Sequence, residues 1–189
     1  MPALVIILAY FLGAIPTAYI AGHLQGKDIR EMGDHNVGAA NAYRELGHKL
    51  GLAVFFIDAG KGVLAVLIAR AAGLSQAGVL FAGLAAVLGH AWSVFLGFSG
   101  GKGVSTTIGI LLVLNTAPVL ILAGPTLLTL CLVKNVTPAM AVLFIALPLV
   151  SWWAGVSGAI ISYGIALPGL VGITDLVNSR QMAHRARHA

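Results

Sequence analysis

Charged residues are scarce in this sequence. They make up 9% of its 189 residues, whereas 59% are hydrophobic, and the mean hydropathy is +0.96. A soluble domain carries about 25% charged residues, so the composition excludes a soluble globular protein and a separate soluble domain. The chain has room for about six or seven helices of the 20 apolar residues that a bilayer core requires. Its function must therefore lie in short loops and at helix ends.

Several other features are missing. Cys131 is the only cysteine, so no disulfide can form within the chain, and we expect Cys131 to have a packing role. No charge precedes Lys27, which favours Met1–Gly22 as a retained first span rather than a cleaved signal peptide. The chain has no basic face interleaved with aromatics for nucleic acid. It also has no histidine pair that combines metal-ligand spacing with carboxylates, and no G-x-S-x-G element, so neither a metal nor a serine hydrolase is expected.

The apolar runs predict an all-α integral membrane protein with seven transmembrane helices. Residues 103–133 carry no charge, and a single helix of that length would measure about 46 Å, well beyond a bilayer core. We therefore predict a break at Asn115 and Pro118, since proline ends or interrupts helices, and another near Gly155–Gly158 within the uncharged residues 135–174. The expected spans are Leu4–Ala21, Leu50–Ile68, Ala77–Phe95, two within 103–133 and two within 135–174.

Basic residues predict the orientation. Cytoplasmic loops hold the excess of lysine and arginine, which places the polar segment 23–49 and the C-terminal tail inside and the N-terminus outside. Such a chain needs an odd number of crossings, so seven fit and six do not, and Lys102 and Lys134 then also face the cytoplasm. We see no internal repeat of the transporter kind and expect residues 1–189 to form a single transmembrane domain. The basic residues that carry this argument are Lys27, Arg30, Arg44, Lys49, Arg180, Arg185 and Arg187.

A glycine-rich loop with one lysine follows the third expected span. Gly100–Gly103 holds Lys102, and consecutive glycines let backbone N–H groups surround an anion while the ammonium adds a charge suited to phosphate. The loop is not a nucleotide P-loop, because Leu96 stands at the first glycine position. A flexible turn between spans is the alternative. The next expected helix begins with hydroxyl residues that complete an anion site, namely Ser105, Thr106 and Thr107.

A second candidate element is the polar stretch Gly33–Arg44. Asparagine side chains there can hydrogen-bond anionic oxygens, and Arg44 can hold a phosphate with two parallel bonds. The alternative is an ordinary turn-rich loop whose arginine only marks the inner side. The binding candidates in this stretch, besides Arg44, are Asn36, Gly38 and Asn41.

Three ionisable residues lie inside predicted spans. His90 precedes the glycine loop, which favours substrate contact over a hydrogen bond to a neighbouring carbonyl. Asp58 and Lys61 stand three residues apart on one helical face, where they can pair. Because each charge is costly within a bilayer, they are either a structural ion pair or a support beneath a phosphate site.

In this order, the motifs resemble the bacterial acyl-phosphate:glycerol-3-phosphate acyltransferase (PlsY) family. The resemblance spans nearly the whole chain. The residues that carry it are Gly13-Ala14-Ile15-Pro16, Tyr19, Asp28-Ile29-Arg30-Glu31, Asn36, Gly38-Ala39, Asn41, Arg44, Asp58-Ala59-Gly60-Lys61-Gly62, Gly89-His90, Phe95, Gly97-Phe98 and Gly100-Gly101-Lys102-Gly103-Val104.

The resemblance implies a seven-helix protein of the bacterial inner membrane, with the N-terminus outside and the active site facing the cytoplasm. It implies acyl transfer from a fatty acyl phosphate to the 1-hydroxyl of glycerol 3-phosphate within membrane lipid, giving lysophosphatidic acid and phosphate without a cofactor. The catalytic residues it implies are Lys102, Arg44, His90 and Asn41. The phosphate-binding residues are Asn36, Gly38, Gly100, Gly101, Gly103, Ser105, Thr106 and His184, with Asp58 and Lys61 beneath them.

The sequence departs from the family pattern in two motifs. The first normally reads Gly-Ser-Gly-Asn-Pro-Gly, and here Asp34, His35 and Val37 replace the serine, the second glycine and the proline. A carboxylate at Asp34 should repel phosphate unless His35 or Arg44 offsets it. In the C-terminal motif, His184-Arg185 is not followed by the usual asparagine. Two alternatives therefore stand beside the enzyme: a non-catalytic paralogue that binds acyl phosphate or lipid, and a small carrier of phosphorylated metabolites.

Overall fold

The computed structural model describes the backbone of residues 1–186 and the side chains of residues 1–177. Within these limits its regular elements are all helical, as the composition predicts. The candidate His184 and the arginines of the tail lie outside the described side chains. The elements are α1 (Pro2–Ala14), α2 (Thr17–His23), η1 (Ile29–Glu31), α3 (Ala39–Glu45), α4 (His48–Ala71), α5 (Gln76–Ala91), η2 (Val94–Leu96), α6 (Val104–Leu114), α7 (Thr116–Val133), α8 (Val136–Trp153) and α9 (Gly158–Ala186).

Six helical stretches among the described residues are long and apolar enough to cross a membrane. They match six of the seven predicted spans. The seventh coincides with α6, which is apolar but only 11 residues long, or about 16 Å at the usual rise. Seven crossings and the orientation of the termini therefore stay predictions. The six stretches are Pro2–His23, His48–Ala71, Gln76–Leu96, Thr116–Val133, Val136–Trp153 and Gly158–Val177.

The first span differs from the prediction because it is broken. Helix α1 ends at Ala14 and α2 begins at Thr17, since Pro16 has no N–H to donate and Ile15 is held outside the helical region, at φ −55° and ψ 118°. Two carbonyl groups at the break receive side-chain donors instead. The Ser93 hydroxyl donates to the Ala14 carbonyl, and the Lys61 ammonium donates to that of Ile15.

The other predicted breaks are confirmed. Asn115 separates α6 from α7, and Pro118 falls in the first turn of α7, where its missing N–H costs no helical hydrogen bond. Helix α8 ends at Trp153 and Gly155 takes a positive φ of 70° before α9 begins. These signals were local, which is why the sequence located them.

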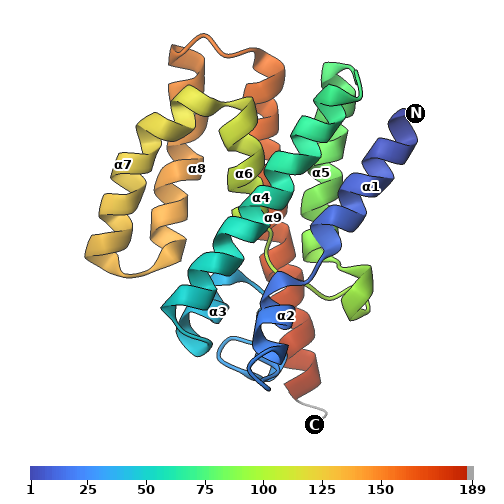
Figure 1. Ribbon diagram of the computed structural model, residues 1–189. Coiled ribbons are helices and arrows are strands. Elements are labelled where there is room, and N and C mark those ends of the chain that lie inside the picture. The colour runs from blue at the N-terminus through green and yellow to red at the C-terminus, as the bar shows by residue number, and fades with distance from the viewer. Residues whose placement is uncertain (187–189) are drawn as a thin grey trace. The chain divides into compact units, whose positions relative to one another are not determined.

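The chain packs as two compact units, one of residues 1–110 with the chain from 170 onward and the other of residues 111–169. The expectation of a single domain over residues 1–189 stays a prediction. In the first unit, α1 and α5 pack side by side (Figure 1). Their backbones lie so close that a Cβ on Gly13 would collide with the Ala86 carbonyl, and one on Gly89 with the Tyr10 carbonyl. Small residues allow such approach between helices in a membrane.

In the second unit, α7 and α8 pack against each other. The side-chain amide of Asn115 donates to the Ser151 hydroxyl at 2.6 Å, and that hydroxyl donates to the Leu147 carbonyl at 2.6 Å. All of the candidate residues with described side chains lie in the first unit.

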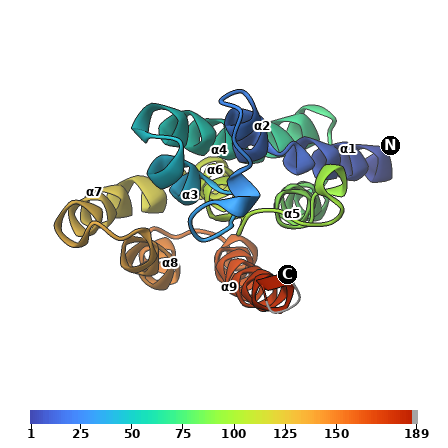
Figure 2. The same cartoon turned by 90° about the horizontal axis from the view of Figure 1, so that it is seen from below.

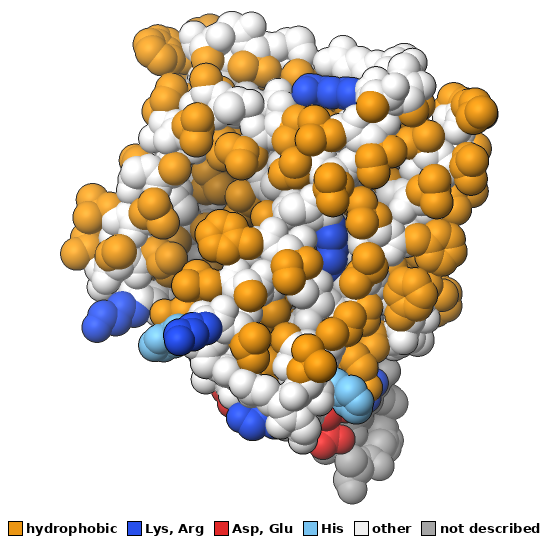
Figure 3. Space-filling model, viewed as in Figure 1, with side chains coloured by type: hydrophobic (Ala, Val, Ile, Leu, Met, Phe, Trp, Pro, Cys, Tyr) orange, Lys and Arg blue, Asp and Glu red, His pale blue; other side chains and the backbone are white. Residues whose placement is uncertain are grey.

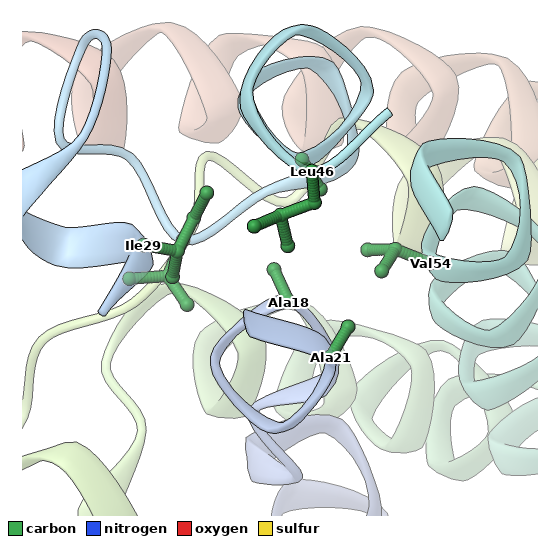
Figure 4. Close-up of a cluster of buried hydrophobic side chains, with 7 residues drawn as sticks. Ala18, Ala21, Ile29, Leu46 and Val54 are labelled. Carbon is green, nitrogen blue, oxygen red and sulfur yellow. The ribbon is translucent and has the colours of Figure 1, made fainter. Parts of the chain in front are cut away.

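The polar segment between α2 and α4 has a hydrophobic core of its own. Ala18 and Ala21 of α2 face Ile29, Leu46 and Val54 (Figure 4), and all of them are buried. The segment lies at the lower end of its unit in Figure 1 and faces the viewer in Figure 2. Hydrophobic side chains cover most of the face seen in Figure 3, while acidic and histidine side chains appear at its lower edge. The core therefore holds a polar loop in a defined position at one end of the spans.

Candidate functional site

Asn41 fixes the backbone of the polar loop. Its side chain is fully buried, and its amide nitrogen lies 3.4, 3.0 and 3.1 Å from the carbonyl oxygens of Ile29, Met32 and Asn36, to which it donates. Its amide oxygen accepts from the Asp34 N–H at 3.3 Å. The structure thus places Asn41 beneath the loop, as the residue that satisfies these backbone groups.

Arg44 carries its charge at the surface of the loop. One guanidinium nitrogen lies 2.7 Å from the Asp34 carboxylate and 3.4 Å from the Asn41 amide oxygen. The other carboxylate oxygen of Asp34 accepts from the Asn36 N–H at 3.3 Å. The family-pattern departure at Asp34 is therefore matched by a direct ion pair with the predicted phosphate-binding arginine.

A second exposed pair lies in the same segment. The Arg30 guanidinium lies 2.6 Å from the Asp28 carboxylate and 4.8 Å from the centre of the Tyr19 ring. Hydrogen bonds from Arg30 hold the pKa of Asp28 below its ordinary value, and the same bonds raise the pKa of Arg30. This pair involves none of the predicted site residues.

The glycine loop packs directly on the end of α5. The Gly101 N–H donates to the His90 carbonyl at 3.1 Å. A Cβ on Gly101 would collide with His90 Nε2 and lie 2.9 Å from the Val37 carbonyl oxygen, while one on Gly100 would collide with the His90 carbonyl. The polar loop and the glycine loop therefore meet beside His90, which the sequence alone did not establish.

Lys102 is tied to α9 through both its backbone and its side chain. The Thr174 hydroxyl donates to the Lys102 carbonyl at 2.8 Å, and the Lys102 ammonium lies 2.8 Å from the Asp175 carboxylate. Gly103 follows with a φ of +88°, a conformation that favours glycine, and α6 begins at the next residue.

The first turn of α6 is buried. Ser105 is 8% exposed, while Thr106 and Thr107 are fully buried with hydroxyl groups that have no hydrogen-bond partner among the described residues. The Thr106 carbonyl lies against Gly62, where a Cβ would collide with it. The structure thus places these hydroxyl residues beneath the glycine loop, at the start of a helix.

Asp58 and Lys61 form the predicted ion pair at 2.6 Å. Their side chains are 1% and 4% exposed, so the pair is buried in the first unit. The Nδ1 atom of His90 lies 3.8 Å from the same carboxylate oxygen, and the second oxygen of Asp58 has no hydrogen-bond partner within the described residues. The pair thus lies directly behind His90.

A small pocket lies beside His90, where the break between α1 and α2, the polar loop and the glycine loop meet. Thr17 and Ser93 line it and were not among the sequence candidates, nor were Thr174 and Asp175. Asp175 carried a usable signal, because it is the one acidic residue after Asp58 and an ionisable residue near a span suggests function. The lining residues are Ala14, Pro16, Thr17, Val37, His90, Ser93, Leu96, Gly100 and Gly101.

The described residues contain no group of three or more histidine, cysteine or acidic side chains that could hold a metal ion. The candidate site instead offers fixed cations, backbone amides of the glycine loop and hydroxyl groups. These groups are suited to binding anions and to stabilising negative charge.

The helices define an integral membrane protein with several candidate spans, whose candidate site residues gather in the first unit. The family model for glycerol-3-phosphate acyltransferase matches residues 3–185, and the chain belongs to that family. The resemblance seen in the motifs is thereby confirmed.

Individual relatives, similar in sequence or in structure, are also named glycerol-3-phosphate acyltransferases. The chain is 51% identical to glycerol-3-phosphate acyltransferase 4 of Dehalococcoides mccartyi over 96% of this chain and 98% of the relative. It is similar to crystal structures of PlsY, an integral membrane glycerol 3-phosphate acyltransferase, at 32% identity over 97% of this chain and 92% of theirs. The TM-score is 0.84 for the glycerol 3-phosphate form and 0.82 for the lysophosphatidic acid form.

Proposed function

We propose that this protein transfers a fatty acyl group from an acyl phosphate to the 1-hydroxyl of glycerol 3-phosphate, giving lysophosphatidic acid and inorganic phosphate. Membership of the family supports the acyl transfer to glycerol 3-phosphate. The observation that carries the proposal is the contact between the polar loop and the glycine loop at Val37, Gly101 and His90. It brings the segments of two cations to one pocket, and both substrates carry a phosphate.

The chemistry needs little from the protein beyond positioning. The acceptor hydroxyl oxygen forms a bond to the acyl carbon, the bond from that carbon to the phosphate oxygen breaks, and the departing phosphate takes the hydroxyl proton. An acyl phosphate is already activated, so no protein nucleophile or cofactor is required. Orientation and charge stabilisation can then supply the rate enhancement.

Each candidate residue has a role in this proposal. Lys102 and the glycine loop bind phosphate, Arg44 orients a substrate, and His90 is a polar contact beside the reacting groups. Asp58 and Lys61 support His90 from behind. The remaining proposed contributors are Asn36, Gly38, Asn41, Gly100, Gly101, Gly103, Ser105, Thr106 and His184.

We propose the same orientation that the basic residues predict: seven crossings, counting α6 (Val104–Leu114), of the bacterial inner membrane, with the N-terminus outside. The polar segment and the glycine loop then face the cytoplasm, where soluble glycerol 3-phosphate is available. The concentration of lysine and arginine in the polar segment, against Arg70 on the opposite side, supports this orientation. The acyl chain of the donor stays in the lipid.

Phosphate release tests the proposal. Purified protein in detergent should release phosphate from palmitoyl phosphate only when glycerol 3-phosphate is present, with lysophosphatidic acid formed in equal amount. Lys102→Ala should lower kcat/KM by about ten- to a hundredfold, because a hydrogen bond to a charged group contributes about 1.5–3 kcal/mol. An unchanged rate in this variant would remove Lys102 from the site. Labelled glycerol 3-phosphate crossing proteoliposomes without acyl product would instead favour the carrier.

A further inference from the structure

Both cations proposed to bind phosphate are already paired with a carboxylate. Arg44 lies 2.7 Å from Asp34, and Lys102 lies 2.8 Å from Asp175. All four side chains are between 34% and 48% exposed, so a ligand can reach both pairs. The buried Asp58–Lys61 pair, by contrast, is closed to solvent.

Each carboxylate belongs to a segment that is held in place by more than the ion pair. Asp34 accepts a hydrogen bond from the Asn36 backbone, and Asp175 follows Thr174, whose hydroxyl is bonded to the Lys102 carbonyl. A carboxylate displaced from its cation therefore stays beside the bound ligand. A tethered group of this kind acts at a high effective concentration.

The charge on the ligand decides whether displacement is favourable. Exposed ion pairs are weak because water screens them, so a stronger anion can replace the carboxylate. A phosphomonoester carries about −1.5 to −2 charges at pH 7 and three acceptor oxygens. A phosphodiester carries one negative charge on two oxygens, as a carboxylate does, and so has no advantage over the tethered group.

We propose that Asp34 and Asp175 are specificity-determining residues that keep the phosphodiester head groups of membrane lipids out of the site and admit terminal phosphates. The inference rests on the proposed function, in which both substrates and the lipid product carry a terminal phosphate. The discrimination matters because anionic phosphodiester lipids are concentrated at a membrane surface. Unpaired cations at that level would bind them.

The test compares substitutions of equal charge change in nanodiscs of two compositions, phosphatidylcholine alone and phosphatidylcholine with phosphatidylglycerol in equal amounts. Asp34→Asn and Asp175→Asn remove the tethered charges. Asp28→Asn is the matched control, since Asp28 pairs with Arg30 at 2.6 Å in the same polar segment and neither residue is among the proposed site residues. The KM for glycerol 3-phosphate and kcat are measured separately.

Because an anionic surface repels the dianionic acceptor, we expect phosphatidylglycerol to raise the KM of wild type and of Asp28→Asn by the same factor. In Asp34→Asn and Asp175→Asn it should raise the KM by about a further fivefold, since one charge near an anionic surface corresponds to about that factor, with kcat little changed. If phosphatidylglycerol raises the KM of these two variants no more than it raises that of Asp28→Asn, the specificity proposal is wrong. An equal rise in all three variants would be an effect of net charge.

Failure of the proposed function has a different signature. Wild type would then show no turnover with glycerol 3-phosphate in phosphatidylcholine nanodiscs. The choice between the two kinds of phosphate can then still be measured, as the rise in the thermal unfolding midpoint with inorganic phosphate or with dimethyl phosphate, a phosphodiester without lipid chains. Wild type should be stabilised by inorganic phosphate alone, and the Asp34 and Asp175 variants by both. Equal stabilisation of wild type by both ligands would overturn the proposal.

Discussion

The imidazole of His90 leaves no room for a side chain on Gly101. A Cβ there would collide with Nε2 and would also press on the Val37 carbonyl oxygen, 2.9 Å away. The glycine is thus required by the meeting of two loops rather than by its own backbone angles.

Gly101→Ala should therefore impair activity far more than its size suggests. The added methyl group must displace His90 or the polar loop, and a displacement of about 1 Å at a reacting centre can cost about a hundredfold in rate. We expect kcat/KM for phosphate release to fall by that order. Gly60→Ala is the control, because a Cβ on Gly60 meets nothing within 4 Å, and it should keep wild-type activity. Equal activity in the two variants would mean that the loops do not hold this contact.

Lys61→Met should destabilise the protein strongly. It leaves the buried Asp58 carboxylate without its cation and removes one of the two donors to the Ile15 carbonyl, which also accepts from the Thr17 N–H. Breaking a buried ion pair costs about 3–5 kcal/mol. The thermal unfolding midpoint in detergent should fall accordingly. Adding Asp58→Asn should recover part of the loss, because it removes the unpaired charge. A double variant less stable than Lys61→Met would argue against this pairing.

Asn41→Ala should release the polar loop. The Asn36 carbonyl loses the amide that donates to it, and the Ile29 and Met32 carbonyls keep only their backbone donors. An unsatisfied buried group costs about 1–3 kcal/mol. We expect limited proteolysis to cut the segment between α2 and α4 much faster than in wild type. Asn135→Ala, which removes an exposed cap from α8, should leave that cleavage rate unchanged. The prediction fails if both variants are cut alike.

The Asp28–Arg30 pair sets a weak pH dependence of stability. Arg30 lowers the pKa of Asp28 in the folded state. The pair's contribution to the free energy of unfolding is therefore complete above the ordinary pKa of about 3.9, and it is lost as the pH falls through the lower pKa of the folded state. Asp28→Asn should cost about 0–1 kcal/mol at pH 7, as exposed pairs do. The difference in unfolding midpoint from wild type should shrink toward pH 3, and a difference that grows in acid would contradict the assignment.

The sequence located local features of the fold well. Asn115 and Pro118 marked the break before α7, and the spacing of Asp58 and Lys61 predicted their contact, because both inferences depend only on neighbouring residues. The break at Pro16 was missed because the apolar residues on both sides read as one span. Proline alone left open whether the helix would bend or stop. The side chains that donate to the carbonyls at the break, Lys61 of α4 and Ser93 after α5, come from distant parts of the chain.

The candidate site was predicted as separate motifs rather than as an arrangement. Lys102, His90 and Arg44 could be selected by residue type, since glycine-rich and asparagine-rich loops with cations suit phosphate. The side chains that contact these residues could not be predicted. Lys102 pairs with Asp175 on α9, and no local spacing relates Asp175 to a loop so far back in the chain. The contact of Val37 with Gly101 depends likewise on how α5 and the polar segment pack.

The attachment of Lys102 to Thr174 and Asp175 has a consequence for biosynthesis. Chains are made from the N-terminus. The polar loop, α5 and the glycine loop are therefore synthesised before Thr174 and Asp175 of α9, which contact Lys102. The lysine acquires its counter-ion only when the last helix is inserted. Until then, the Lys102 carbonyl also lacks the hydroxyl donor that Thr174 provides in the folded protein.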